Sequence, residues 1–273
     1  MMRMTIDVDA YFARIGYQGS RAPTLETLRA LHALHPRAIP FENLDPYSRR
    51  GVELSPGALE AKLVRSARGG YCYEQNGLFM HVLRALGFEV HGRAARVRWG
   101  VPDDVVMPRS HMTLRVELED GPYLADVGFG LLTPVAPLRI VDDVEQQTPL
   151  ETLRMRTMGE GRVVEAKSHD GWRALYWLDD ATFLAPDYET LNWFTSTHPT
   201  SRFVRNLIVA RPTRSGRLTL VNRELTHRTP ERPAEVHTIQ SVAELRGVLE
   251  REFGIDLSRL DDIDASLERA LVV

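Results

Sequence analysis

The chain of 273 residues contains one cysteine, Cys72, within the segment RGGYCYEQN, residues 68–76. A single cysteine can form neither an intramolecular disulfide nor a cysteine-rich metal site. If a helix begins here, its unpaired N–H groups and partial positive charge favour a thiolate. Gly69 and Gly70 would allow a sharp turn and the close approach of another molecule to the sulfur. Free cysteines are also often buried and inert, so both interpretations of Cys72 stay open at this point.

A reactive thiol needs a base, and the base needs a group that orients it. Among nine histidines, His111 stands out because it begins the alternating segment SHMTLRVEL, residues 110–118, on the polar face of the expected strand. There its side chain can reach a cleft between the strand and a preceding helix. Asp126 lies within the otherwise apolar segment YLADVGFG, where an unpaired carboxylate is unfavourable. Asp126 is therefore expected to have a partner.

The partner of Asp126 depends on the register of two strands. A two-residue turn at Asp120 and Gly121 would place Asp126 opposite Arg115 and leave His111 about 13 Å away along the strand. A longer loop, a bulge or the curl of a closing barrel would bring His111 and Asp126 together, because both lie on one face. Spacing alone favours neither the ion pair nor a Cys-His-Asp triad.

Three blocks of structure are predicted around these residues. The first is helical: Thr24 is expected to cap a helix that Pro36 stops, and Ser55 with Pro56 begins another. A third helix begins near Cys72 and ends at Gly87. The leucines at 25, 28, 31 and 34 form a one-sided helical stripe.

The second and third blocks contain strands. From residue 88 on, alternating segments such as GRVVEAK and WRALYWL predict an antiparallel sheet or barrel of short strands. In the last block, RFVRNLIVA and RLTLVNREL are expected to be strands around a turn at Ser215 and Gly216. The segment SVAELRGVLEREFGI is predicted to be a helix with a capping box from Ser241 to Glu244.

Composition excludes several classes of function. The net charge is −3, the chain holds two lysines, and no cationic stripe with interleaved aromatic residues is present, which argues against nucleic-acid binding. No apolar run approaches the roughly 18 residues of a membrane helix, and the first residues do not resemble a signal peptide. A cytoplasmic protein without a membrane partner is therefore expected.

Five segments together resemble the successive signatures of the arylamine N-acetyltransferase family. They are IPFENLD (39–45), RGGYCYEQN (68–76), SHMTLRV (110–116), ADVGFG (125–130) and LNWFTSTHPTSRF (191–203). Their order and spacing and the total length fit that family. The resemblance implies an α+β fold of three domains with a cysteine-protease-like catalytic core: a helical bundle over 1–87, an antiparallel β-barrel over 88–195 and an α/β lid over 196–273.

The resemblance also implies a chemistry. It places a catalytic triad on Cys72, His111 and Asp126, and so decides the register question in favour of the triad. The implied reaction is a two-step acetyl transfer from acetyl-CoA, a co-substrate, through acetyl-Cys72 to an arylamine, arylhydrazine or hydrazide. No metal is implied, and xenobiotic metabolism is the implied role.

Supporting residues follow from the same resemblance. Phe41, Tyr71, Gly128, Phe129 and Gly130 are expected to contact substrates. Glu42 and Arg68 are expected to form a buried ion pair that braces the loop before the cysteine. Arginines or backbone N–H groups would hold the CoA phosphates, and Thr195, Ser196 and Ser201 are expected to make polar contacts with CoA.

Three rival functions stay open. A cysteine hydrolase with the same triad would act without CoA. An amide synthase of the same superfamily would close macrolactams from carrier-bound acyl chains and ignore acetyl-CoA. A non-enzymatic fold would keep Cys72 as an unreactive core residue.

Overall fold

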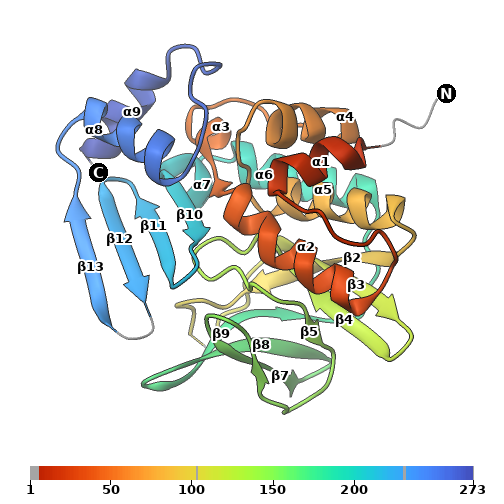
Figure 1. The fold of residues 1–273 in the computed structure, drawn as a ribbon. Helices are drawn as coiled ribbons and strands as arrows, with labels where there is room; N and C mark the ends of the chain where they lie inside the picture. Colours follow the sequence, from red (N-terminus) through yellow and green to blue (C-terminus); the bar gives the residue numbers. More distant parts are fainter. Residues whose placement is uncertain (1–5, 103, 230–231, 273) are drawn as a thin grey trace.

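The first block of the chain is helical, as predicted (Figure 1). The computed structural model describes residues 6–102, 104–229 and 232–272. The helices of this block are α1 (Val8–Ile15), α2 (Leu25–Ala38), α3 (Leu44–Tyr47), α4 (Pro56–Leu59), the π-helical turn η1 (Glu60–Arg65) and α5 (Cys72–Ala85). No helix among the described residues is long and apolar enough to cross a membrane.

The predicted caps of these helices are present. The hydroxyl oxygen of Thr24 accepts a hydrogen bond from the N–H of Thr27 at the start of α2, and Ser55 caps α4 with Pro56 in the first turn. The prediction that Pro36 stops α2 is wrong, because the helix continues to Ala38. Pro36 lies in the last turn, where its missing N–H removes only one helical hydrogen bond.

Helix α5 is the central helix of the molecule and begins at Cys72, as predicted. All eight residues from Cys72 to Phe79 are buried. At its start, a carboxylate oxygen of Glu74 accepts a hydrogen bond from the N–H of Tyr71 at 3.0 Å. Past its end, Gly87 adopts a left-handed conformation (φ +90°), which favours glycine at this position. The first turn of α5 is therefore fixed within the core and carries the thiol.

The middle of the chain forms one eight-stranded antiparallel sheet, ordered β5-β4-β3-β2-β9-β8-β7-β6. Its strands are β2 (Glu89–Val97), β3 (Arg109–Leu118), β4 (Gly121–Ala125), β5 (Leu138–Arg139), β6 (Gln146–Gln147), β7 (Thr152–Met158), β8 (Gly161–Ser168) and β9 (Gly171–Leu178). The side chain of Gln146 links the two edge strands, accepting from the N–H of Arg139 at 2.8 Å and donating to its carbonyl at 2.9 Å. The sheet is thus a nearly closed barrel.

The hairpin between β3 and β4 differs by one residue from the predicted one. Leu118 pairs with Gly121, so the turn consists of Glu119 and Asp120 rather than Asp120 and Gly121. Moving the turn by one residue shifts the pairing by two positions, so each residue of β4 lies opposite a residue two positions earlier on β3 than predicted, and the residues on each face stay the same.

The alternative that spacing left open, an ion pair between Arg115 and Asp126, is consequently not formed. Arg115 pairs across the hairpin with Leu124, and its guanidinium binds Glu117 and Asp180. Strand β4 ends at Ala125, so Asp126 is the first residue beyond the ladder.

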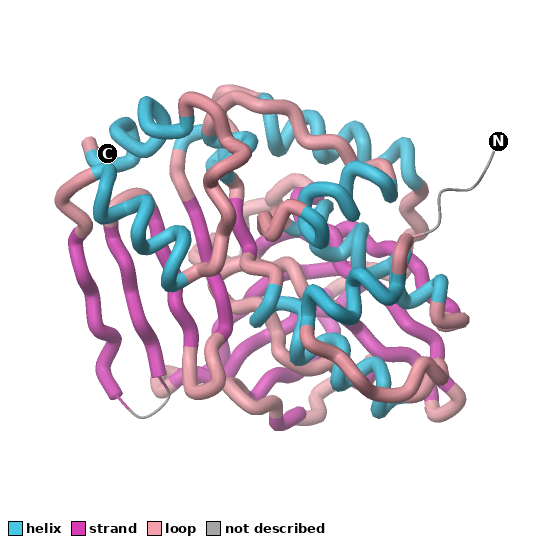
Figure 2. Tube along the Cα trace, turned by 45° about the horizontal axis from the view of Figure 1, so that its top comes forward, coloured by secondary structure: helices cyan, strands magenta, loops and turns pink. Residues whose placement is uncertain are grey.

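The last block contains a second antiparallel sheet, ordered β1-β10-β11-β12-β13, beneath the C-terminal helices (Figure 2). Its elements are α6 (Ala185–Thr197), α7 (Arg202–Arg205), β10 (Ile208–Pro212), β11 (Arg217–Val221), β12 (Glu224–Thr229), β13 (Arg232–Thr238), α8 (Val242–Gly247), the π-helical turn η2 (Val248–Glu252) and α9 (Ile263–Leu271). The edge strand β1 (Phe41–Glu42) comes from the first block.

Two strand predictions in this block need correction. The residues RFVR form the short helix α7, which Ser201 caps, and only the following residues form strand β10. The segment RLTLVNREL is two strands, because Asn222 adopts a left-handed conformation (φ 54°) between β11 and β12. Ser241 caps α8 by accepting from the N–H of Glu244, whose carboxylate accepts from Gln240 rather than from Ser241. The domain limits at 87 and 195 stay predictions, and α6 extends across the second.

Candidate active site

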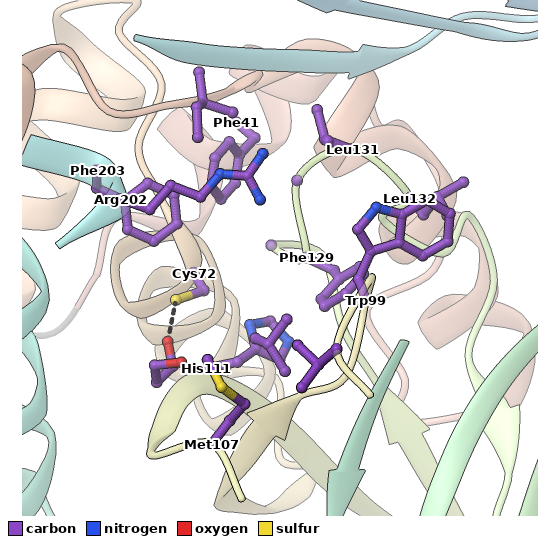
Figure 3. A pocket seen from close by; sticks show the side chains of 16 residues that line it. Phe41, Cys72, Trp99, Met107, His111, Phe129, Leu131, Leu132, Arg202 and Phe203 are labelled. Atoms are coloured by element: carbon purple, nitrogen blue, oxygen red, sulfur yellow. Dashed lines mark hydrogen bonds between the residues drawn. The ribbon is translucent and has the colours of Figure 1, made fainter. Parts of the chain in front are cut away.

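Cys72 and His111 line one cavity of about 270 Å³ (Figure 3). Asp126 lies behind His111, and its Oδ2 is 2.6 Å from His111 Nε2. All three side chains are buried, with exposed fractions of 3% or less. This contact leaves Nδ1 as the ring nitrogen of His111 that can act on the thiol. The Cys72 Sγ lies 3.7 Å from the carbonyl oxygen of Ser110, which is at most a weak hydrogen bond.

Three different elements supply these side chains. Cys72 is the first residue of α5, His111 lies near the start of β3, and Asp126 directly follows β4. In the observed register, Leu114 faces Ala125, so Asp126 comes next to the position opposite Thr113 and two residues from His111. The two-position shift in pairing therefore brings His111 and Asp126 together without a bulge.

Asp126 is held as an ionised carboxylate by several donors. Its Oδ1 accepts from the side-chain amide of Asn76 and from the N–H of Gly128, both at 3.0 Å. Burial opposes ionisation, but His111 and these hydrogen bonds outweigh it and lower the pKa of Asp126. The carboxylate is thus fixed in charge and in orientation.

The charge of Asp126 dominates the electrostatics of His111. Burial alone would lower the pKa of His111, yet the carboxylate of Asp126, with a smaller contribution from Cys72, raises it to about 10. The ring is therefore an imidazolium at neutral pH. This cation and Cys72 line the same cavity, and Cys72 lies at the N-terminus of α5.

Asn76 is a positioning residue that sequence analysis did not assign. It lies one helical turn after Cys72 on the same face of α5, a spacing that could have identified it. Its amide donates to the carbonyl of Met112 at 2.7 Å as well as to Asp126, and its oxygen accepts from the N–H of Val127 at 3.0 Å. One side chain thus connects the three segments that carry Cys72, His111 and Asp126.

His32 and Tyr176 were also missed. The N–H of Asp126 donates to His32 Nε2 at 3.0 Å, and burial lowers the pKa of His32 to about 4, so the ring is neutral and can accept. The ring of Tyr176 lies 4.9 Å from that of His111, and Phe129 lies 5.1 Å from it on another side. No local pattern in the sequence indicates that residues this distant in the chain would enclose His111.

The cavity is lined mainly by apolar side chains. Of the residues expected to contact substrates, Phe41, Gly128, Phe129 and Gly130 line it. Tyr71 does not: its ring is fully buried and packs edge-on against Phe203, which does line the cavity. The remaining walls include Val97, Trp99, Val101, Met107, Leu131, Leu132, Arg202 and Ile208. An aromatic ring fits walls of this kind.

Glycines around the thiol serve internal packing. A Cβ on Gly69 would lie 2.1 Å from the carbonyl oxygen of Pro40, and one on Gly70 would lie 2.8 Å from Glu74. A Cβ on Gly128 would lie 3.0 Å from the Cα of Cys72. The expectation that Gly69 and Gly70 admit another molecule to the sulfur is therefore wrong, because the protein itself occupies that space.

A second group of charges braces the loop before Cys72. We call Glu42, Asp45, Lys62, Arg68 and Glu74 the loop cluster. Arg68 binds Glu42 at 2.7 Å and Asp45 at 3.2 Å, and Lys62 Nζ lies 2.5 Å from Asp45 and 2.6 Å from Glu74. Glu42 also accepts from the N–H of Leu44 at 2.6 Å. The cluster ties β1, η1 and the first turn of α5 together.

The hydroxyls expected to contact CoA are used inside the protein. Thr195 donates to the carbonyl of Leu191 and Ser196 to that of Asn192, each at 2.8 Å, while Ser201 donates to the carbonyl of Thr195. All three residues are buried. They stabilise the end of α6 and its connection to α7, and they do not line the cavity around Cys72.

Comparisons with known proteins identify acetyltransferases as similar to this chain. A family model described as N-acetyltransferase matches residues 24–262. An arylamine N-acetyltransferase of Mycolicibacterium smegmatis is 41% identical and covers 99% of both chains, and one of Escherichia coli is 40% identical over 92% of this chain and 90% of the relative. The structure of Mycobacterium marinum arylamine N-acetyltransferase in complex with CoA matches with a TM-score of 0.93 at 40% identity, covering 98% of this chain and 99% of that one.

Proposed function

Because the chain belongs to the arylamine N-acetyltransferase family, we propose that it transfers an acetyl group from acetyl-CoA to arylamines, arylhydrazines and hydrazides through an acetyl-Cys72 intermediate. The observation that carries this proposal is the buried chain of contacts from the cavity to Asp126. Cys72 faces the cavity, and His111 binds Asp126 at 2.6 Å. A thiol nucleophile, a histidine base and a third side chain that orients the base, in this order, form the arrangement of papain-type cysteine enzymes.

In the first step, the Cys72 thiolate attacks the carbonyl carbon of acetyl-CoA. A new C–S bond forms, the C–S bond to CoA breaks, and CoA leaves as a thiolate that takes a proton from the His111 imidazolium. One thioester replaces another, so the step is nearly isoenergetic and needs no other source of energy. Asp126 keeps the ring oriented throughout.

In the second step, the amine nitrogen attacks the acetyl-Cys72 carbonyl. The neutral His111 accepts the proton that the nitrogen loses, and Cys72 leaves as a thiolate beside the restored imidazolium. Weakly basic aromatic amines suit this step because they are neutral at physiological pH and keep a free lone pair. Both half-reactions thus use the same base and return the enzyme to its starting state.

The test is intact-protein mass spectrometry after brief incubation with acetyl-CoA and no acceptor. We expect a gain of one acetyl group, which disappears when an anisidine is added. The variant Cys72→Ala should gain nothing. Because Cys72 is the only cysteine, this one variant is a complete control for thiol acetylation.

Other outcomes would identify the rival functions. A thiol that alkylates readily but is not acetylated would favour a hydrolase or an amide synthase, which hydrolysis of activated esters and transfer from carrier-bound acyl chains would then distinguish. A thiol that reacts with alkylating reagents only after unfolding would contradict every enzymatic proposal.

A further inference from the structure

The active-site cavity contains one arginine, Arg202, among mainly apolar walls. Apart from the imidazolium of His111 at the buried end, Arg202 is the only charged side chain among the described residues that line the cavity, and none of these residues is Asp or Glu. Arg202 is exposed, whereas Cys72 is 3% exposed. The cation therefore stands at the mouth of the cavity and the thiol at its buried end. Figure 3 shows the arginine side chain extending past Phe203 toward Phe41.

The guanidinium of Arg202 has no partner within residues 6–102, 104–229 and 232–272: no carboxylate lies within 4 Å, and no hydrogen bond reaches it. Other arginines near the site are engaged. Arg68 binds Glu42, and Arg109 forms two hydrogen bonds with Asp179. Asp126, the acid behind the cavity, is already bound to His111. The positive charge of Arg202 is thus available to a bound molecule.

From this arrangement, which rests on the proposed function, we infer that Arg202 selects acceptors that carry a carboxylate on the ring, away from the reacting amine. The amine must reach Cys72 at the buried end, and the ring then lies between walls such as Phe41 and Phe129. A substituent on the opposite side of the ring points to the mouth, where Arg202 stands. A planar guanidinium matches a carboxylate with two parallel hydrogen bonds.

The donor is a less suitable source of the anion. The acetyl group carries no charge, and the pantetheine arm separates the thioester from the CoA phosphates. A dicarboxylic acyl group such as malonyl would hold its carboxylate two bonds from the carbonyl, close to the buried Cys72 rather than at the mouth. Donor and acceptor could each supply a carboxylate to Arg202. The acceptor is favoured because an aromatic ring is long enough to hold its carboxylate at the mouth while its amine reaches Cys72.

The experiment compares 4-aminobenzoate with 4-aminobenzamide, which has nearly the same shape and no charge, in wild type and in Arg202→Gln. We expect Arg202→Gln to lower kcat/KM for 4-aminobenzoate about 10- to 100-fold, mainly through KM, because a hydrogen bond to a charged group is lost. The value for 4-aminobenzamide should change less than about threefold. Arg205→Gln is the matched control: it removes the same charge from α7, but Arg205 binds the carbonyl of Pro199 and does not line the cavity.

Other outcomes would overturn the inference. If Arg202→Gln lowered kcat/KM equally for both acceptors, Arg202 would have a structural role. If Arg205→Gln lowered kcat/KM for 4-aminobenzoate as much as Arg202→Gln does, the effect would come from the overall positive charge of α7 rather than from contact with Arg202. A higher KM for acetyl-CoA with both acceptors, or a selective loss with malonyl-CoA as donor, would assign Arg202 to the donor. Acetylation of Cys72 without acceptor is measured in each variant: its absence from wild type contradicts the proposed function, whereas normal acetylation without discrimination between acceptors contradicts this inference alone.

Discussion

Two groups of buried charges meet the first turn of α5, and only one of them faces a cavity. The triad contributes Cys72 to this turn, and the loop cluster contributes Glu74, two residues later. In the loop cluster every carboxylate binds a cation, and Glu74 and Glu42 also accept from backbone N–H groups. In the proposed triad, Cys72 makes a weak 3.7 Å contact with the carbonyl of Ser110 and lines the cavity. Access to the cavity, rather than buried charge itself, therefore distinguishes the group that we propose to be reactive.

This comparison predicts that activity and stability can be changed separately. Changes in the triad should remove activity and leave stability largely intact, because its parts are arranged for a reacting molecule. Changes in the loop cluster should reduce stability and leave the activity of the folded fraction largely intact, because its charges satisfy one another.

The largest effect is expected from Asp126→Asn. The asparagine oxygen can still accept from Asn76 and Gly128, but its NH₂ group faces His111 Nε2, which must then accept. The ring proton moves to Nδ1, so the ring donates to Cys72 and cannot take a proton. We expect kcat to fall about 10⁴-fold, with a change in melting temperature of only a few degrees.

Asp179→Asn is the matched control for this variant. Asp179 binds Arg109 on β3, the strand that carries His111, but it does not line the cavity. The kcat of Asp179→Asn should stay within about twofold of wild type. Steady-state kinetics and thermal unfolding of both variants test the prediction, and retained activity in Asp126→Asn would remove the carboxylate from the mechanism.

The second effect concerns the loop cluster. Arg68→Met removes a cation that is 4% exposed and leaves Glu42 buried without it. We expect a loss of about 3–5 kcal/mol in the free energy of unfolding, measured by urea denaturation. The kcat per folded molecule should change little. Arg65→Met, three residues earlier, removes an exposed arginine that binds Asp7 and Glu60, and the free energy of unfolding should change far less than in Arg68→Met.

The sequence predicts the residues of the proposed triad better than those of the loop cluster, and the reason is physical. The helix that begins at Cys72 is a local feature, and so is the alternation that places His111 on a strand, and both were predicted. The contact of His111 with Asp126 depends on the register of a hairpin, and a one-residue error at Asp120 was enough to favour Arg115 equally. The family resemblance, rather than spacing, decided between the two.

The loop cluster shows a further limit. Glu42 and Arg68 were expected to pair because of the resemblance, but Lys62 and Glu74 were not connected to them. Its five members come from five different segments, namely β1, α3, η1, the loop before Cys72 and α5. Their contacts depend on tertiary packing, which no periodicity in the sequence reports. Asn76 is different, because it follows Cys72 by one helical turn. The sequence could therefore predict that Asn76 lies on the same face of the helix as Cys72, although it could not predict the hydrogen-bond partners of Asn76.

Asn76 and Gln75 sharpen the comparison because they are adjacent amides on α5 that serve different groups. Asn76→Ala removes the hydrogen bonds to Asp126, Met112 and Val127, so the triad loses its alignment. We expect kcat to fall about 10- to 100-fold, together with a loss of about 1–3 kcal/mol in the free energy of unfolding.

Gln75 provides the matched comparison. Its amide donates to the carbonyls of Ile39, Pro40 and Gly70, and its oxygen contacts His35. Gln75→Ala should destabilise the protein by a similar amount but lower kcat of the folded fraction much less. If both variants reduced kcat equally, the separation between the triad and its surroundings would not hold.

The smallest effect is a pH dependence of stability in the loop cluster. Three carboxylates there face two cations, so one negative charge is in excess. Burial, only partly offset by Lys62, raises the pKa of Glu74 to about 7. A carboxyl whose pKa is higher in the folded than in the unfolded state stabilises the fold when protonated. Its contribution is fully present below about pH 4.5 and is lost as the pH rises through about 7.

The variant Glu74→Gln isolates this contribution. Between pH 4.5 and 6.5, His32 and His35 act in the opposite direction, since burial lowers their pKa values to about 4 and about 3, but they are present in both proteins. The pKa of His111 is raised in the folded protein, so its contribution to stability changes only above its unfolded pKa. The pKa of Asp126 is lowered, so its contribution changes only below its unfolded pKa. The free energy of unfolding of Glu74→Gln minus that of wild type should therefore rise by about 2 kcal/mol over this range. A constant difference in urea titrations at these pH values would show that Glu74 takes up no proton in the folded protein over this range, which would contradict the prediction.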